Sequence, residues 1–179
     1  MSGKKKPAAA PALRNPTLER AIREALEDRD SYLAYADWLE REGDPRGGWI
    51  ARNVELMRDP SSPERFAEVE AWLARHGAAC VPNFAGGRET AALRWRYGFI
   101  QVAKVLRLSS SPSLAERTRR LLQHPSAAFL EGLVLGFPVY KDSNPGLDEA
   151  LLELEHAPET LSRVYVADTP STLPIGELG

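Results

Sequence analysis

Few side chains in this 179-residue sequence stand at spacings that could support catalysis or metal binding. His76 and Cys80 are four residues apart, as a base and a nucleophile on one helical face would be, but Gly77 lies between them and is expected to end the helix. We therefore interpret Cys80 as an ordinary small apolar residue. His124 and His156 each precede a proline at corresponding points of an internal repeat, which explains their placement better than metal binding does.

The sequence contains no Cys-x-x-Cys pair, no His-Glu-x-x-His, no glycine-rich phosphate loop and no Gly-x-Ser-x-Gly. We therefore predict that the protein is not an enzyme and that it uses no cofactor and no metal. An active site between two parts of the chain is an alternative. It would need a pocket that gathers titratable groups such as Asp37, Arg46, His76 or Arg96.

Charge is distributed unevenly along the chain, although the formal net charge is only −2. Residues 88–124 hold 8 basic and 2 acidic side chains, whereas residues 125–179 hold 2 basic and 9 acidic ones. Arg94, Arg96 and Tyr97 mix cations with an aromatic ring in the basic segment, which is typical of nucleic-acid-binding surfaces. Nucleic-acid binding through residues 88–124 is therefore an alternative function. The acidic segment that follows would repel a polyanion, so a protein partner is favoured.

The elements that must position these groups begin with four amphipathic helices over residues 16–76. Asn15-Pro16, Asp44-Pro45 and Ser62-Pro63 each combine a capping side chain with a proline at the first helical position. Gly43 is expected to end the second helix. Short connections between the helices predict a compact helical bundle with aromatic residues in its core.

One stretch of the bundle, residues 32–51, carries a recognisable motif. It resembles the repeat-companion domain family of myxobacterial and planctomycete proteins, whose hallmark reads approximately YADWLEERGDPRGEFI. The matching residues are Tyr35, Ala36, Asp37, Trp38, Leu39, Glu40, Gly43, Asp44, Pro45, Arg46, Gly47 and Ile50. The chain departs from the pattern at Gly48, where Glu is usual, and at Trp49, where Phe is usual. The resemblance implies a structural motif that often precedes leucine-rich-type repeats, with no established catalytic activity.

The motif also carries an acidic and a basic residue on either side of a turn. We predict a partly buried ion pair between Asp37 and Arg46 that locks this turn. Breaking such a pair from one side costs about 3–5 kcal/mol when it is buried.

A helix, a proline turn and a strand recur in the second half of the chain. The first set of apolar residues matches the second at one constant offset of 31 residues: Leu121, Leu130, Leu133 and Leu135 match Leu152, Leu161, Val164 and Val166. This pattern predicts a leucine-rich-type solenoid, although the usual period is about 20–29 residues. A small α/β sheet domain of another type is the structural alternative. The pattern stops in mid-repeat at residues 173–178, which suggests either a shortened chain or an edge covered by another chain.

We therefore predict an α+β protein in which an N-terminal helical bundle caps a short leucine-rich-repeat-like α/β solenoid. The expected parts are a flexible tail at 1–14, the bundle at 15–77, a linker at 78–92 and the repeats at 93–179. The bundle is expected to shield the apolar edge of the first repeat.

The predicted function is a non-catalytic scaffold for protein–protein interaction, whose partner is another protein or further repeats of the same chain. The predicted contact residues lie between the leucines and in the basic segment: Arg94, Arg96, Tyr97, Glu131, Val134, Arg163 and Tyr165. A single cysteine and the lack of a long apolar run predict a cytoplasmic protein that does not associate with membranes. The resemblance to the repeat-companion family implies a bacterial protein.

Overall fold

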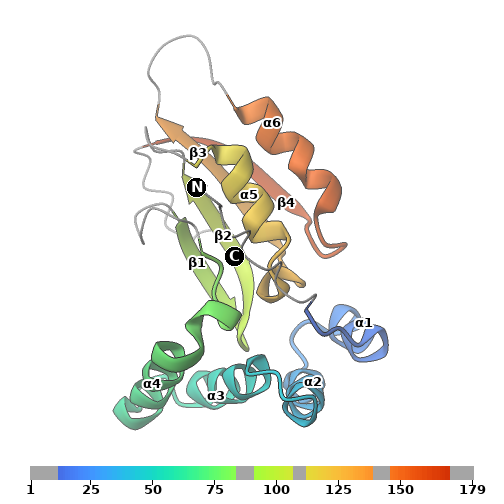
Figure 1. Cartoon of the computed structure of the whole chain (residues 1–179), viewed down its shortest axis with the longest axis vertical. Helices are drawn as coiled ribbons and strands as arrows, with labels where there is room; N and C mark the ends of the chain where they lie inside the picture. The colour runs from blue at the N-terminus through green and yellow to red at the C-terminus, as the bar shows by residue number, and fades with distance from the viewer. Residues whose placement is uncertain (1–11, 84–90, 107–111, 139–145, 170–179) are drawn as a thin grey trace, which may run out of the picture.

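The computed structural model describes residues 12–83, 91–106, 112–138 and 146–169. Four N-terminal helices gather at one end of a four-stranded sheet, and two later helices lie along the sheet (Figure 1). This arrangement confirms the predicted α+β class. Within the described ranges, no helix combines the length and the apolar character that crossing a membrane requires.

The bundle consists of α1 (Pro16–Glu24), α2 (Arg29–Arg41), α3 (Arg46–Arg58) and α4 (Pro63–Cys80). The side chains of Asn15 and Ser62 cap α1 and α4 by accepting hydrogen bonds from backbone N–H groups, as predicted. The prediction that Gly77 ends the last helix is wrong, because α4 continues to Cys80. Gly77 does not adopt the left-handed conformation with which glycine ends helices. The predicted linker therefore begins after Cys80.

The sheet has the order β1-β2-β3-β4. Its strands are β1 (Ala91–Arg96), β2 (Phe99–Leu106), β3 (Gly132–Pro138) and β4 (Arg163–Thr169). β1 and β2 form an antiparallel hairpin, and β2, β3 and β4 run parallel. Gly132 pairs with Arg163 and Pro138 with Thr169, so β3 and β4 are aligned at the 31-residue offset of the leucine pattern.

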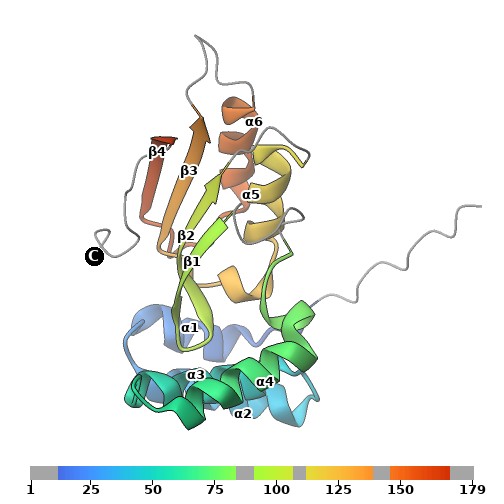
Figure 2. The same cartoon turned by 90° about the vertical axis from the view of Figure 1, so that its left-hand side faces the viewer.

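Two helical segments connect the parallel strands: α5 (Leu114–Leu122), and α6 (Leu147–Leu152) with the short 3-10 helix η3 (Glu153–His156) after it. α5 and α6 cover the same face of the sheet (Figure 2). On that face Leu114 and Leu121 of α5 are in one apolar core with Leu133 and Leu135 of β3. Side chains alternate along a strand, so Val134 points to the opposite face.

The bundle and the sheet share a second core. The ring of Tyr32 in α2 lies 5.8 Å from that of Phe99 and 6.1 Å from that of Phe129, which precede or begin the parallel strands. The indole of Trp49 donates a 2.8 Å hydrogen bond to the carbonyl of Gly98 in the hairpin turn. The bundle therefore lies against the ends of the strands, and β1 occupies the edge of β2 (Figure 2). The prediction that the bundle shields the edge of the first repeat is wrong.

The segment before α1 is also part of the fold. The carbonyl of Leu13 accepts a 2.8 Å hydrogen bond from Arg46, and Arg14 forms a 2.6 Å ion pair with Glu19. The predicted flexible tail of 1–14 is therefore too long at its end, while residues 1–11 lie outside the described part of the chain.

Candidate functional site

The turn between α2 and α3 is held by a buried ion pair. Gly43 adopts φ +76°, the left-handed conformation that ends α2 as predicted. Asp44 accepts hydrogen bonds from the backbone N–H of Arg46 (2.9 Å) and from its guanidinium (2.7 Å to Nη2). Only 5% of Arg46 is exposed, and the same Nη2 donates to the carbonyl of Leu13. The turn is thus locked to the segment that precedes α1.

The predicted Asp37–Arg46 pair is wrong. Asp37 lies on the exposed side of α2, whereas its neighbours Ala36 and Leu39 are buried. Arg46 pairs instead with Asp44, two residues before it in the same turn. The predicted buried ion pair of Arg46 exists, but its partner is the carboxylate of Asp44.

The other motif residues are also structural. The hydroxyl of Tyr35 donates to Glu19 (3.2 Å), and the ring of Trp38 packs 5.6 Å from that of Tyr35. The carbonyl of Pro45 accepts a hydrogen bond from the indole of Trp72 in α4 (3.2 Å). The motif therefore joins α1, α2, α3 and α4.

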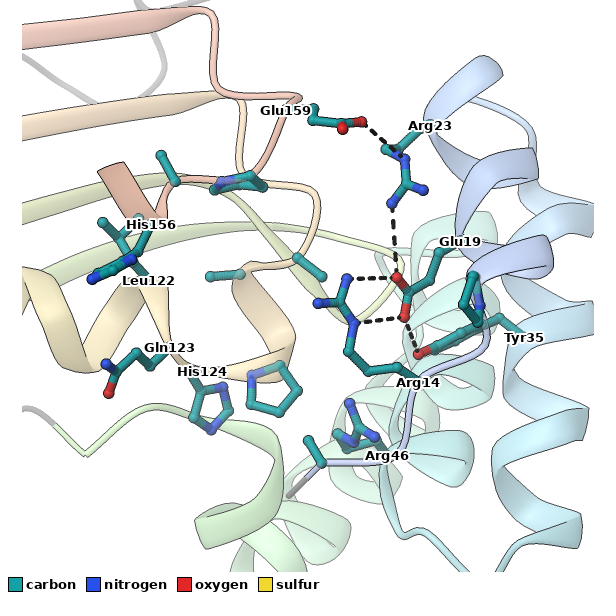
Figure 3. A pocket seen from close by; sticks show the side chains of 17 residues that line it. Arg14, Glu19, Arg23, Tyr35, Arg46, Leu122, Gln123, His124, His156 and Glu159 are labelled. Carbon is teal, nitrogen blue, oxygen red and sulfur yellow. Dashed lines mark hydrogen bonds and ion pairs between the residues drawn. The ribbon is translucent and has the colours of Figure 1, made fainter. Parts of the chain in front are cut away.

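A cleft of about 600 Å³ opens between the bundle and the segments that follow α5 and α6 (Figure 3). Its polar side chains include Arg14, Glu19, Arg23, Tyr35, Arg46, Gln123, His124, His156 and Glu159. Of the residues that an active site between the two parts would gather, Arg46 lines the cleft, whereas Asp37, His76 and Arg96 do not. The cleft is therefore a different site from the predicted one.

Glu19 is the centre of charge in this cleft. Arg14 binds its two carboxylate oxygens at 2.6 and 3.0 Å, Tyr35 donates to it, and Arg23 lies 3.7 Å away (Figure 3). Burial raises the pKa of Glu19, but the hydrogen bonds and charges of Arg14, Tyr35 and Arg23 outweigh burial and lower it overall. Glu19 is thus an ionised anchor for the chain before α1.

Two further groups have pKa values that favour their neutral forms: His124 in the cleft and Cys80 at the end of α4. Burial, assisted by the charge of Arg46, lowers the pKa of His124 to about 4, and its Nδ1 accepts a 3.2 Å hydrogen bond from the N–H of Ser126. Burial raises the pKa of Cys80 to about 11, which keeps its thiol protonated near neutral pH. No group of three His, Cys, Asp or Glu side chains that could hold a metal ion occurs among the residues that the structure describes.

Comparisons with protein-family models, curated proteins and solved structures found no match. The resemblance to the repeat-companion family therefore stays a prediction that depends on the motif residues. The geometry of the chain itself is what bears on its function.

Three of the predicted partner-binding residues have internal roles. Arg96, at the end of β1, contacts Glu27 at 2.5 Å and also pairs with Glu131. Tyr97 forms the hairpin turn with φ +46° and packs its ring 4.9 Å from that of Tyr32. These contacts hold the hairpin against the bundle, so they do not support a role for Arg96, Tyr97 and Glu131 in partner binding.

The remaining four predicted residues lie on the sheet face that α5 and α6 do not cover. Val134 is only 1% exposed, so the prediction that it contacts a partner is wrong. Arg94 and Arg163 are half-buried, and Tyr165 is 39% exposed. Of these four, Tyr165 presents the largest surface to a partner.

The basic segment uses several of its charges within the fold. Arg119 pairs with Glu153 at 2.6 Å, and Arg120 pairs with Glu116 at 2.9 Å. Arg117 is fully buried and donates to the carbonyl of Leu106 at 3.0 Å.

Among the described residues of the second half of the chain, the largest group of exposed apolar side chains lies on α6 and β4. We call it the α6–β4 edge: Leu151, Leu152, Val164 and Val166. Leu152 is 73% exposed and Val166 is 48% exposed, although the matching Leu121 and Leu135 of the preceding unit are completely buried. An exposed apolar patch of this kind marks an interaction surface more often than a solvated one.

Two groups of residues escaped the sequence analysis. The apolar pattern of α1 places Glu19 on the solvent side, yet the structure buries it to 3% exposure. Arg14 and Arg23 on either side of Glu19 were the available signal. The exposure of Leu152 could not be predicted from the leucine pattern. Leu121 holds the same position in that pattern and is buried.

Proposed function

We propose that this chain is a non-catalytic protein-interaction module built on leucine-rich-like repeats, and that it binds its partner through the α6–β4 edge. The observation that carries the proposal is the difference in exposure between matching apolar residues of the two units. The same apolar positions are buried where a following unit covers them and exposed on α6 and β4, the last unit that the structure describes.

The arrangement of the strands supports a repeat architecture. β2, β3 and β4 are parallel, β3 pairs with β4 at an offset of 31 residues, and Val102 pairs with Gly132 at an offset of 30. α5 and α6 lie on one face, as helices do in leucine-rich-type stacks. In such a stack each unit buries the apolar side of its neighbour, so an uncovered unit is a natural place for a partner.

The two alternatives gain less support. Arg96, Arg119 and Arg120 of the basic segment are engaged by carboxylates, which weakens the case for phosphate contacts. In the cleft, Glu19 is saturated by cations and a hydroxyl, so it is poorly placed to act as a general base. Binding without catalysis agrees best with these contacts.

Site-specific photo-crosslinking in source cells tests the proposal. A benzophenone amino acid in place of Leu152 should give a discrete adduct with another protein. The same group in place of Glu68, an exposed residue of α4, serves as the control.

The adduct should disappear when Val166→Lys is added, because a lysine on β4 interrupts the apolar surface. An adduct pattern that is the same from both positions, or that survives Val166→Lys, would contradict the proposed function.

A further inference from the structure

The interface between the two units shows how this fold covers an apolar helix. α5 is covered by α6 and η3, which follow it in the stack. Apolar residues form the centre of this contact, and Arg119 of α5 makes two hydrogen bonds to Glu153 of η3, at 3.0 and 2.6 Å. A cation on one unit thus meets a carboxylate on the next.

The helical part of the last described unit, α6 and η3, carries several carboxylates and no Lys or Arg. Asp148, Glu149 and Glu155 are exposed on α6 and η3, beside the exposed Leu151 and Leu152. No Lys or Arg occurs between residues 146 and 162. A surface that joins leucines and carboxylates is complementary to a helix that joins leucines and cations.

A second copy of the chain fits this surface poorly. Two copies related by a twofold axis would place the same patch against itself, so the exposed carboxylates of α6 would face one another. Like charges at an interface are unfavourable. The charge pattern therefore favours a different, basic polypeptide.

The strand that follows α6 and η3 adds a second requirement. β4 is the outermost strand of the described sheet, and its Val164 and Val166 point toward the side that α6 occupies. An added strand can hydrogen-bond to the outer edge of such a strand while its side chains extend the apolar surface.

On the basis of the proposed function, we propose that the partner is a basic polypeptide that packs a leucine-bearing cationic helix on α6 and adds a strand to β4. The helix supplies Lys or Arg to Asp148, Glu149 and Glu155. The apolar residues of the α6–β4 edge supply the contact that buries surface.

Two synthetic peptides with the same apolar pattern and opposite charge test this inference. Both have the sequence of residues 146–166, the unit that packs on α5 and β3 in the fold. One keeps the natural acidic residues, and the other carries Asp148→Lys, Glu149→Lys, Glu153→Lys and Glu155→Lys. Fluorescence anisotropy with the full chain should show roughly tenfold tighter binding of the basic peptide at low salt, with affinity falling as salt is added.

Variants of the protein separate specific docking from simple attraction of cations. Leu152→Glu adds a carboxylate but removes an apolar contact, so the proposal requires weaker binding, whereas simple attraction requires tighter binding. Glu155→Lys should also weaken binding, and Glu68→Lys on the remote α4 makes the same charge change as a control. Leu152 is 73% exposed, so its substitution should leave the far-UV circular dichroism spectrum unchanged.

Each outcome bears on the inference in a stated way. Preference for the basic peptide, lost in Leu152→Glu and Glu155→Lys and kept in Glu68→Lys, supports it. Equal affinity for both peptides, binding that survives Leu152→Glu, or no binding would overturn it. A dimer in sedimentation that Leu152→Glu dissociates would show that a second copy is the occupant. Crosslinking at Leu152 tests the proposed function separately, since a specific adduct with a partner that is not basic would uphold that function and refute this inference.

Discussion

Arg46 shows what a buried charge requires of its neighbours. Its guanidinium is almost completely removed from water and is satisfied by the Asp44 carboxylate and the Leu13 carbonyl. A buried pair of this kind adds little net stability, because both groups lose hydration. Removal of one member is costly, because the other charge stays buried without compensation.

Asp44→Ala should therefore lower the free energy of unfolding by about 3–5 kcal/mol. Asp37→Ala, which removes an exposed carboxylate from the same motif, should change it by less than about 0.5 kcal/mol. Urea denaturation followed by circular dichroism measures both values. Equal effects of the two substitutions would refute the assignment of Asp44 as the partner of Arg46.

His124 makes stability depend on pH. Its pKa falls from 6.5 to about 4 on folding, because burial disfavours the imidazolium. Between these values the unfolded chain takes up a proton that the folded chain does not. The free energy of unfolding should therefore fall as pH decreases from 6.5 to 4, by up to roughly 3 kcal/mol from this residue.

His124→Asn should reduce this dependence, since an amide keeps an acceptor for Ser126 but does not titrate. The measurement is the unfolding midpoint in urea at several pH values for both proteins. The difference in the free energy of unfolding between the native protein and His124→Asn should shrink as pH falls. Parallel plots of this free energy against pH for the two proteins would show that His124 is not the group responsible.

At the scale of elements, close helix packing depends on two adjacent glycines at the start of α3. A Cβ at Gly47 would lie 2.6 Å from the Ala36 carbonyl oxygen of α2, and a Cβ at Gly48 would lie 2.5 Å from the Trp72 ring of α4. The first contact is with backbone, which cannot move aside without shifting the helix. The glycines thus let α3 pack closely against both neighbours.

Gly47→Ala should destabilise the protein by about 1–3 kcal/mol through this overpacking. Gly77→Ala is the matched control, because Gly77 is inside α4 and a Cβ there meets nothing within 4 Å. Alanine favours helix over glycine, so this variant should be more stable by about 0.5–1 kcal/mol. Thermal unfolding should move the two midpoints in opposite directions, and a shift of both in the same direction would contradict the packing argument.

Local signals in the sequence sufficed for the elements but not for their docking. A cap followed by proline located α1 and α4, and the leucine spacing gave the register of β3 on β4. The bond from Trp49 to Gly98 joins residues 49 positions apart, and no local pattern encodes it. Asp37 and Asp44 are both aspartates close to Arg46 in the sequence, and only the path of the turn decides which of them pairs with Arg46.

For the candidate site, the sequence supplied the apolar residues but not their exposure. Leu152 and Val166 were predicted as members of the repeat, yet their neighbours decide whether they are buried. The cleft depends on Glu19 and His124, which come from separate parts of the chain and meet only in the folded molecule.

At the scale of the whole molecule, the bundle and the sheet are joined through one continuous contact. Phe99 and Phe129 from the sheet side belong to the core of the bundle, and Trp95 of β1 packs 5.5 Å from Trp49 of α3. Both parts should therefore unfold together, as small single domains usually do.

Leu133→Ala tests this coupling, since Leu133 is buried in the sheet away from the bundle. The substitution should cost about 2–5 kcal/mol. Tryptophan fluorescence reports mainly on the bundle, where Trp38, Trp49 and Trp72 lie, and its midpoint should fall as far as the midpoint seen by circular dichroism. An unchanged fluorescence midpoint would show that the bundle unfolds on its own.

The constant register of β3 on β4 also bears on how such a chain can change in length. Gly132 to Pro138 face Arg163 to Thr169 at one offset, so a duplicated stretch of 31 codons would add one strand and one helix without disturbing the ladder before it. The bundle contacts the ends at which the strands begin, whereas a new unit would be added along the sheet. The contacts of the bundle would therefore survive the insertion. Gene duplication could thus lengthen the protein in whole units, and a protein engineer could extend it by the same route.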